Sequence, residues 1–303
     1  MKVGVIGTGH MGENHVRTYL SLQDHCQFVG IYDHDEKRSC QIAEKYNVSQ
    51  FQSLEALLQK VDAVSVAVPT EFHYDIGLTC IKYNVHMLME KPITSTIVQA
   101  KDLNQKAINA GVKLQVGHIE LYNPLITFLI KELEHSDIIG IEFHRMSPYS
   151  DRIKRVDVVK DLMIHDLYIL QKIFSEKLLE FYALGKMIEN TSKHAAVMIE
   201  LPEGVIAQLT ASFKSKRKLR TIQVLTEEAL YEIDILRNEI KITRDKDIQT
   251  IHMVHDTNPL SIQLLDFINC IQQEKEPYVS GKDGIRTLLI TNKIIETINS
   301  HKA

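Results

Sequence analysis

Long apolar runs, paired cysteines and an excess of one charge are all missing from this sequence of 303 residues. No segment approaches the run of about 18 apolar residues that a membrane-spanning helix requires, so no membrane role is expected. The four cysteines are widely scattered and form no Cys-x-x-Cys pair. This argues against a structural zinc site and a disulfide framework, and for the reducing environment of the cytoplasm.

The charges nearly balance, with 35 Lys and Arg against 39 Asp and Glu and a net charge of −4. Such a chain has no global field that would attract nucleic acid or anionic lipid. The one basic cluster, residues 214–220, is typical of a solvated loop or strand end. His252 and His255 are three apart and would face opposite sides of a strand, so no metal site is expected.

The length and the order of patterns predict two domains. Single cores stop growing at about 250 to 300 residues, so this chain is long enough for two. Strand and helix patterns alternate in residues 1–122, which is typical of an α/β Rossmann domain with a parallel sheet. In residues 123–303 strands follow one another with few helices between them, which predicts an α+β domain with a large, mainly antiparallel sheet. The C-terminal helices, near 260–273 and 284–299, are expected to pack back.

Periodicity and turn residues give approximate bounds for the other elements. Helices are expected at 11–22, 35–46, 72–83, 100–110 and 124–133. Strands are expected at 2–7, 28–32, 61–69, 85–90 and 112–118, and then at 138–146, 194–202, 205–213, 220–226 and 229–235.

A glycine-rich loop after the first strand fits the dinucleotide-binding pattern G-x-G-x-x-G and reads Gly7-Thr8-Gly9-His10-Met11-Gly12. Its glycines suit a tight turn, approach of the backbone to a pyrophosphate, and close packing of helix on strand. Asp33 follows about 20 residues later, where a carboxylate can accept hydrogen bonds from the adenosine ribose and repel a 2′-phosphate. NAD is therefore favoured, while Lys37 and Arg38 leave NADP open.

Two further motifs follow strands, and ligands of an open α/β sheet gather at the carboxyl ends of strands. These motifs read Met89-Glu90-Lys91-Pro92 and Pro69-Thr70-Glu71-Phe72-His73. Together they resemble the glucose-fructose oxidoreductase, inositol dehydrogenase and MocA (Gfo/Idh/MocA) family. The resemblance implies that Lys91 lies between nicotinamide and substrate, that Pro92 fixes its direction, often through a cis peptide, and that Pro69, Thr70, His73 and Glu90 contribute to the cofactor site.

The second domain carries Asp161 and His165, four residues apart and hence on the same face of a predicted helix. The spacing is similar to the family's Asp-x-x-x-His, which implies that His165 accepts the proton of the substrate hydroxyl and that Asp161 orients it. The resemblance then implies an NAD(P)-dependent oxidoreductase that oxidises a secondary hydroxyl of a sugar, nucleotide sugar or polyol to a ketone. Lys91, Asp161 and His165 are the predicted catalytic residues.

Within the family, the segments VGHIELYNP and SPYSDRIKRVDVVKDLMIHDL look most like UDP-N-acetylglucosamine 3-dehydrogenases. This chain has Leu121 and Tyr122 where those enzymes typically have Arg-Phe, and Asp157 where a glycine is common. Loss of the arginine removes a possible anion clamp. The candidate substrate-binding residues are His118, Tyr122, Tyr149 and Arg152; Arg152 and Arg155 either contact a diphosphate or are solvated.

Two other functions stay open from sequence. The same fold could serve as a non-catalytic NAD-binding regulatory module, or it could act on a non-sugar alcohol or an imine. The resemblance also implies a homodimer or homotetramer formed through the second-domain sheet.

Overall fold

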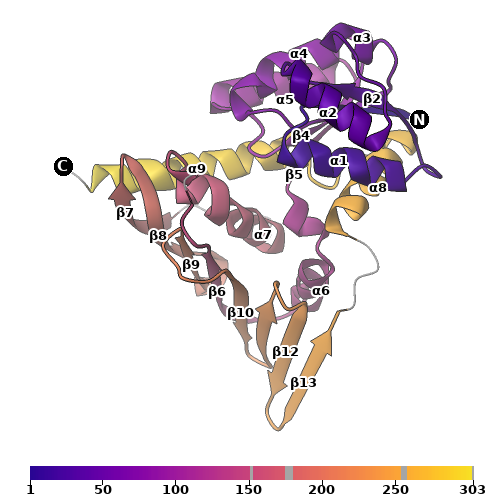
Figure 1. Cartoon of the computed structure of the whole chain (residues 1–303). Coiled ribbons are helices and arrows are strands. Elements are labelled where there is room, and N and C mark those ends of the chain that lie inside the picture. The colour runs from indigo at the N-terminus through magenta and orange to yellow at the C-terminus, as the bar shows by residue number, and fades with distance from the viewer. Residues whose placement is uncertain (151–152, 175–179, 254–257, 302–303) are drawn as a thin grey trace. The chain divides into compact units, whose positions relative to one another are not determined.

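The computed structural model describes residues 1–150, 153–174, 180–253 and 258–301. The chain forms two compact units, coloured along the sequence in Figure 1. The first contains residues 1–122 and 257–288, and the second contains residues 123–256 and 289–303. None of the helices formed by the described residues is long and apolar enough to cross a membrane.

The first unit is built on a parallel sheet of five strands in the order β2-β1-β3-β4-β5. The strands are β1 (Lys2–Ile6), β2 (Gln27–Tyr32), β3 (Ala63–Val66), β4 (His86–Glu90) and β5 (Leu114–Gly117). Buried residues run continuously along β3 and β5, as expected for parallel strands covered on both faces. Because the strand order reverses at β1, the carboxyl ends of β1 and β3 border a switch point, where open α/β sheets bind ligands.

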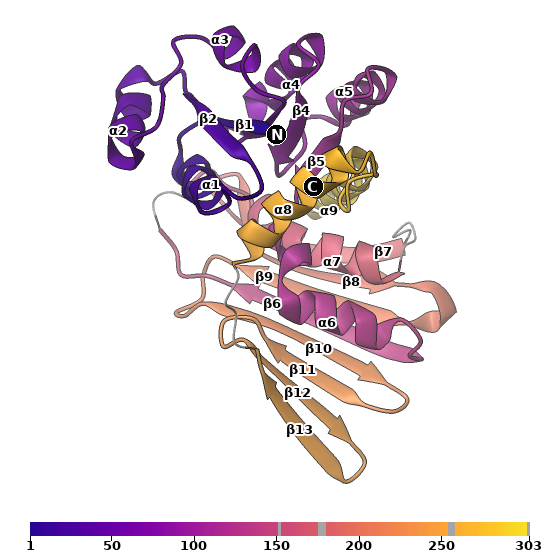
Figure 2. The same ribbon diagram turned by 90° about the vertical axis from the view of Figure 1, so that its right-hand side faces the viewer.

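Helices cover both faces of this sheet (Figure 2). On one face, α1 (His10–Ser21) and α8 (Pro259–Gln272) share a core with β1, to which Tyr19 and Phe267 contribute. The other face carries α3 (Leu54–Leu58), α4 (His73–Lys82) and α5 (Ile97–Asn109). The remaining elements of this unit are α2 (Glu36–Tyr46) and the 3₁₀ turns η1 (Thr70–Phe72) and η2 (Ile119–Tyr122).

Side-chain caps decide where several helices begin, because the first backbone N–H groups of a helix lack partners. The Asp35 carboxylate accepts from the N–H of Arg38, and α2 starts at Glu36, the residue after Asp35. Thr96 caps α5, which therefore begins at Ile97 and not near Ala100 as predicted. Ser280 and Asp283 cap each other's N–H groups, so α9 (Gly281–Ser300) also begins earlier than predicted.

The second unit is built on eight strands in the order β13-β12-β11-β10-β6-β9-β8-β7. All neighbours are antiparallel except β6 and β9, which confirms the prediction of a mainly antiparallel sheet. The strands are β6 (Ile138–Met146), β7 (Glu180–Ile188), β8 (Thr191–Glu200), β9 (Ile206–Ser212), β10 (Leu219–Thr226), β11 (Leu230–Asp234), β12 (Glu239–Arg244) and β13 (Asp247–His252).

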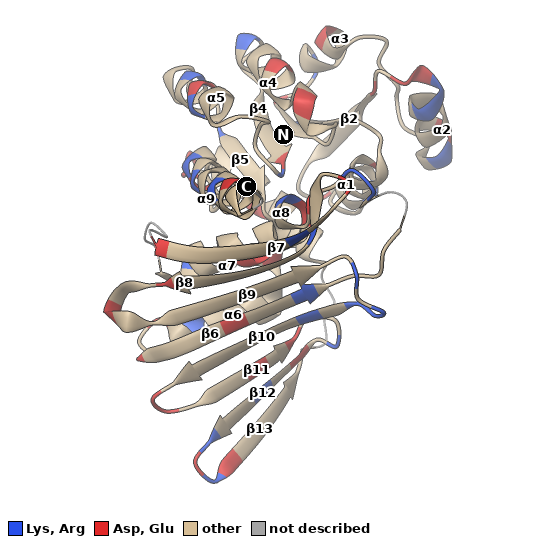
Figure 3. Cartoon of the chain, turned by 90° about the vertical axis from the view of Figure 1, so that its left-hand side faces the viewer, with Lys and Arg blue, Asp and Glu red and all other residues tan. Residues whose placement is uncertain are grey.

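Helices α6 (Pro124–Leu133) and α7 (Ile164–Phe174) lie on one face of this sheet. A five-residue π-helical turn, η4 (Val159–Met163), leads directly into α7, and the 3₁₀ turn η5 (Pro202–Gly204) links β8 to β9. Figure 3 shows the opposite face, which is largely uncharged along β7 and β8. Tyr182, Met198 and Ile206 are all more than half exposed.

Two buried cations hold the chain against the sheet in this unit. Arg145 of β6 pairs with Asp166 of α7 at 2.9 Å, and both side chains are at most 3% exposed. Lys193 at the start of β8 is fully buried, and its Nζ donates to the carbonyls of residues 153, 154 and 156 at 2.7 to 2.9 Å. Burial lowers the pKa of Lys193. These contacts fix both the segment before η4 and the start of α7.

Loss of one partner of the Arg145–Asp166 pair leaves a buried charge without its counterion. We expect Asp166→Ala to lower the free energy of unfolding of the second unit by about 3 to 5 kcal/mol. Urea-dependent hydrogen exchange of peptides from β6 and α7 measures this change. Lys241→Met is the matched control: its pair with Glu232 is more than one third exposed, and its loss should cost about 1 kcal/mol or less. Equal effects of the two variants would contradict the assignment.

Candidate active site

The predicted site residues of the first unit gather where its strands end. The glycine loop follows β1 and Asp33 follows β2. Pro69 and Thr70 follow β3, Lys91 follows β4, and His118 follows β5. Because the strands are parallel, all these residues lie along the carboxyl edge of one sheet, where ligands of such sheets bind.

The three glycines of the loop have different surroundings. Gly7 has φ +89°, which disfavours any other residue. A Cβ on Gly12 would lie 1.8 Å from the carbonyl oxygen of Gly7, so α1 and β1 approach as closely as only glycine allows. A Cβ on Gly9 would meet nothing within 4 Å. The space next to Gly9 is thus open for a group that approaches the backbone.

Helix α1 begins at this open point. Its N-cap is Gly9, and no side chain caps its first turn. The N-terminal N–H groups of a helix and the positive end of its dipole suit an anion such as a pyrophosphate. His10 is exposed and Met11 is partly buried in this first turn. The loop therefore fits the phosphates of a dinucleotide.

Asp33 and Arg38 both contact the loop through Thr8. The Asp33 carboxylate accepts hydrogen bonds from the N–H of Thr8 and, at 2.7 Å, from its hydroxyl. Arg38 Nε donates to the carbonyl oxygen of Thr8 at 2.9 Å. The structure thus brings the predicted ribose-binding carboxylate directly beside the glycine loop.

His73 links the loops that follow β3 and β4. It is 1% exposed, and its ring nitrogens lie 3.0 Å from the carbonyl oxygens of Val68 and Pro92. Burial lowers its pKa. A neutral imidazole can donate to only one of the two carbonyls. This placement favours a structural role for His73 over the predicted contact with cofactor; Pro69 and Thr70 of η1 are more accessible.

The Glu-Lys-Pro motif lies at the end of β4. The Lys91–Pro92 peptide bond is cis, in keeping with the resemblance. Glu90 is largely buried, and its carboxylate contacts His15 of α1 at 3.0 Å. Burial lowers the pKa of His118 to about 3, with the ammonium of Lys91 as a smaller cause. His118 is therefore neutral at neutral pH and lies in the electrostatic field of Lys91.

Tyr122 is buried within the first unit. Its hydroxyl donates to Asp266 of α8 at 2.9 Å and accepts from the side chain of Gln115 at 3.0 Å. Burial and the nearby carboxylate raise its pKa. The hydroxyl is committed to these partners, which favours a structural role over the predicted one in binding substrate. Asp266 was not predicted because it lies 144 residues from Tyr122, and Gln115 was not predicted because it belongs to no motif.

The second unit carries the predicted Asp-x-x-x-His pair. Asp161 lies in η4, and His165 lies in the first turn of α7. Nδ1 of His165 is 2.6 Å from the hydroxyl of Tyr168, which is 2% exposed. Tyr168 belongs to no motif and was not predicted, although its spacing of three residues places it beside His165 on the helix.

Asp157 is part of the framework that holds η4. Its carboxylate accepts from the N–H of Val159 at 2.9 Å and from the N–H of Ser192 at 3.0 Å. It therefore caps the π-helical turn and ties it to β8.

The substrate-binding candidate Tyr149 is 38% exposed, and Nζ of Lys214 lies 4.0 Å from the centre of the Tyr149 ring. The fourth substrate-binding candidate, Arg152, lies outside the described residues.

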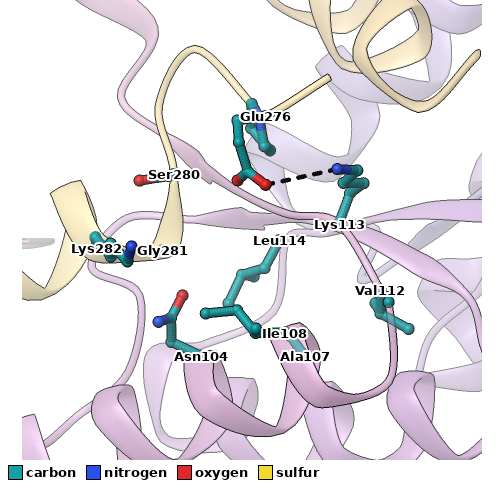
Figure 4. A pocket seen from close by; sticks show the side chains of 12 residues that line it. Asn104, Ala107, Ile108, Val112, Lys113, Leu114, Glu276, Ser280, Gly281 and Lys282 are labelled. Carbon is teal, nitrogen blue, oxygen red and sulfur yellow. Dashed lines mark ion pairs between the residues drawn. The ribbon is translucent and has the colours of Figure 1, made fainter. Parts of the chain in front are cut away.

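A hollow of about 390 Å³ in the first unit lies away from these residues (Figure 4). Ile108 of α5, Leu114 at the start of β5 and Gly281 at the start of α9 line it, and Lys113 pairs with Glu276 at 3.7 Å. None of the predicted site residues borders it.

Among the described residues, no group of three or more His, Cys, Asp or Glu could hold a metal ion.

Comparisons with known proteins agree with this geometry. Residues 1–118 match the model of the Gfo/Idh/MocA oxidoreductase family, described as an NAD-binding Rossmann fold. The UDP-N-acetylglucosamine 3-dehydrogenase of Acidithiobacillus ferrooxidans is 28% identical over 302 residues, which cover 95% of this chain and 94% of that enzyme. The chain therefore resembles the Gfo/Idh/MocA oxidoreductases in residues 1–118 and resembles this dehydrogenase over nearly its whole length.

Other known proteins also match this chain along most of their length. A solved structure of the Acidithiobacillus enzyme has a TM-score of 0.94 at 27% identity and covers 99% of this chain and 98% of that one. The NAD-dependent scyllo-inositol 2-dehydrogenase of Bacillus subtilis is 22% identical over 94% of this chain and 90% of its own. Levoglucosan dehydrogenase in complex with NADH shares the fold, with a TM-score of 0.88 at 15% identity over 99% and 97% of the two chains.

The glycine loop gives a matched pair of variants. Gly9→Ala should leave the thermal midpoint unchanged but raise the Kd for NADH at least about tenfold, because the new methyl group fills the space next to α1. Gly12→Ala should lower the midpoint even without NADH, because its Cβ would clash with Gly7. Thermal melts and NADH titrations measure both effects. Wild-type NADH affinity in Gly9→Ala would show that the cofactor does not approach this loop.

Proposed function

We propose that this chain is an NAD-dependent dehydrogenase that oxidises a secondary hydroxyl of a sugar, and that its substrate is a nucleotide sugar of the UDP-N-acetylglucosamine type. The single observation that carries the proposal is the similarity to UDP-N-acetylglucosamine 3-dehydrogenase over nearly the whole of both chains. The Glu-Lys-Pro motif at the carboxyl edge of the Rossmann sheet and the Asp-x-x-x-His motif of the second unit support it.

The cofactor half of the proposal rests on the loop and on Asp33. The open space at Gly9 and the uncapped start of α1 suit the pyrophosphate. A carboxylate held beside the loop disfavours a 2′-phosphate, which supports NAD over NADP. Arg38 already donates through Nε to the carbonyl of Thr8, which reduces its freedom to bind such a phosphate. When bound, the nicotinamide supplies the hydride acceptor.

The chain itself supplies the proton acceptor and the positive charge. We assign His165 as the base that takes the proton of the substrate hydroxyl, with Asp161 orienting it. We assign Lys91 to hold the same oxygen and to stabilise the negative charge that develops on it. The convergence of Lys91 and His165 on one hydroxyl stays a prediction, since the two residues belong to different units.

Tyr168 lies beside the imidazole of the assigned base, with its hydroxyl 2.6 Å from Nδ1 of His165. We assign Nε2 of His165 as the nitrogen that takes the proton of the substrate hydroxyl. For Nε2 to accept a proton, Nδ1 must carry a hydrogen and donate it to the oxygen of Tyr168. The Tyr168 hydroxyl can accept this hydrogen, so its position is compatible with the tautomer of His165 that the assignment requires.

Recognition of the nucleotide is assigned to the second unit. Tyr149 is partly exposed and offers an aromatic face, and Lys214 beside it carries a charge complementary to a diphosphate. The contribution of Arg152 to substrate binding stays a prediction.

Assembly into a homodimer or homotetramer through the exposed face of the eight-stranded sheet also stays a prediction. The exposed apolar side chains of Tyr182, Met198 and Ile206 support it.

A substrate panel tests the proposed function. NAD and NADP reduction is followed by absorbance with UDP-N-acetylglucosamine, UDP-glucose, glucose 6-phosphate, free glucose, myo-inositol and scyllo-inositol. We expect the highest kcat/KM with UDP-N-acetylglucosamine and NAD. Preference for an inositol would overturn the assignment of a nucleotide sugar as substrate but would keep the proposed oxidation of a secondary hydroxyl. Tight NADH binding without turnover of any compound would overturn the enzymatic proposal and leave a binding module.

Removal of the Lys91 ammonium separates chemistry from cofactor binding. We expect Lys91→Ala to lower kcat at least about a hundredfold while the Kd for NADH changes less than about twofold, because the removed ammonium acts on the reacting oxygen of the substrate. Lys113→Ala is the matched control, since Lys113 precedes β5 at the opposite edge of the sheet and pairs with Glu276. Wild-type turnover in Lys91→Ala would refute the assigned role.

A further inference from the structure

A chain of buried hydrogen bonds runs through the first unit to the residue before Lys91. The Tyr19 hydroxyl lies 2.9 Å from Ser65 Oγ, and Ser65 Oγ lies 3.0 Å from Nδ1 of His15. Nε2 of His15 lies 3.0 Å from Oε1 of Glu90. Tyr19, Ser65 and His15 are each 0% exposed. Three polar side chains are thus kept in an apolar core, and each has a partner.

The acceptors and donors fix the direction of these hydrogen bonds. A carboxylate only accepts, so Nε2 of His15 donates to Glu90. In a neutral imidazole Nδ1 then accepts, so Ser65 donates to His15 and Tyr19 donates to Ser65. Burial raises the pKa of Tyr19, which keeps its hydroxyl protonated and able to donate. With this tautomer of His15, every hydrogen of these bonds points toward Glu90.

Glu90 connects this chain of hydrogen bonds to Lys91. Oε1 accepts from His15, and Oε2 accepts from the backbone N–H of Lys91 at 3.3 Å. The other side of Glu90 is closed by Gly117, because a Cβ there would lie 3.0 Å from Cα, Cδ and Oε1 of Glu90. The carboxylate is therefore confined to one position, between the imidazole and the backbone that carries Lys91.

We propose that His15, supported by Ser65 and Tyr19, is a positioning residue that holds the Glu90 carboxylate and, through it, the backbone of Lys91. This inference rests on the proposed role of Lys91 in the dehydrogenase. His15 and Tyr19 lie in α1, the helix whose first turn forms the predicted phosphate site. The same helix thereby serves cofactor binding at its start and the position of Lys91 one turn later.

Two substitutions at His15 separate positioning from simple packing. Methionine fills similar space but has no donor for Glu90, whereas the glutamine amide can donate to Glu90 and accept from Ser65. We expect His15→Met to lower kcat about 10- to 100-fold with little change in substrate KM or in the Kd for NADH, since a small misplacement of a reacting group has effects of this size. His15→Gln should recover most of the loss.

Milder variants cover the case in which His15→Met fails to fold. Gly117→Ala leaves the hydrogen-bonding side chains intact but crowds Glu90, so it should lower kcat in the same way. Ser65→Ala should have a smaller effect, and Tyr19→Phe the smallest, since each removes a more distant link. Thr18→Val is the matched control, because Thr18 also lies buried in α1 and its hydroxyl donates to the backbone carbonyl of Asn14 in the same helix. Its kcat should equal that of the wild type.

An NMR readout keeps this inference separate from the proposed function. The ¹⁵N spectrum of His15 should show the neutral tautomer with hydrogen on Nε2, and the amide resonance of Lys91 should move upfield in His15→Met but not in His15→Gln. If the wild type turns over no substrate, the proposed function fails while these spectra still decide on the hydrogen-bond chain. An unmoved Lys91 amide in His15→Met, or wild-type kcat in both His15→Met and Gly117→Ala, would overturn the inference.

Discussion

The close contact between Gly12 and the carbonyl of Gly7 determines where helix α1 lies, and much of the first unit depends on it. No side chain larger than hydrogen fits at Gly12. The contact brings the start of α1 to the end of β1, next to the open space at Gly9. It also carries His15 within hydrogen-bonding distance of Ser65 and Glu90. One backbone approach thus places both the phosphate site and the support of the Glu-Lys-Pro motif.

The second unit places its predicted base by a different means, through buried charge. The pair Arg145–Asp166 fastens α7 to β6, and Asp166 is the residue after His165. Lys193 donates to backbone carbonyl oxygens of the segment that precedes η4. Asp157 of that segment accepts from the N–H groups of Val159 in η4 and Ser192 in β8. Buried ions of this kind add little stability over apolar side chains of the same volume, but they specify one arrangement when every partner is present. Such specificity suits a segment that we propose orients the imidazole of His165.

The parts of the fold that could be predicted are those with a local signal. The α6 bounds match because Asn123 and Pro124 mark the start of that helix, and the glycine loop was found because three glycines must occupy fixed positions. Strands β7, β12 and β13 were not predicted, because charged residues and Gly185 interrupt their apolar pattern. Contacts between distant segments could not be predicted for another reason. Nothing in the local sequence around His15 or Tyr122 indicates which residues they contact. The resemblance supplied the motifs, but not the buried groups that support them.

The central claim is that this chain moves hydrogen from a sugar carbon to a nicotinamide. UDP-N-acetylglucosamine carrying deuterium at carbon 3 tests it most directly, with mass spectrometry of the nicotinamide formed. We expect NADH with one deuterium on the nicotinamide ring, formed at least about a hundredfold more slowly when Lys91 is replaced by alanine. Unlabelled NADH formed from the labelled sugar, or deuterium delivered to solvent and not to the cofactor, would contradict it.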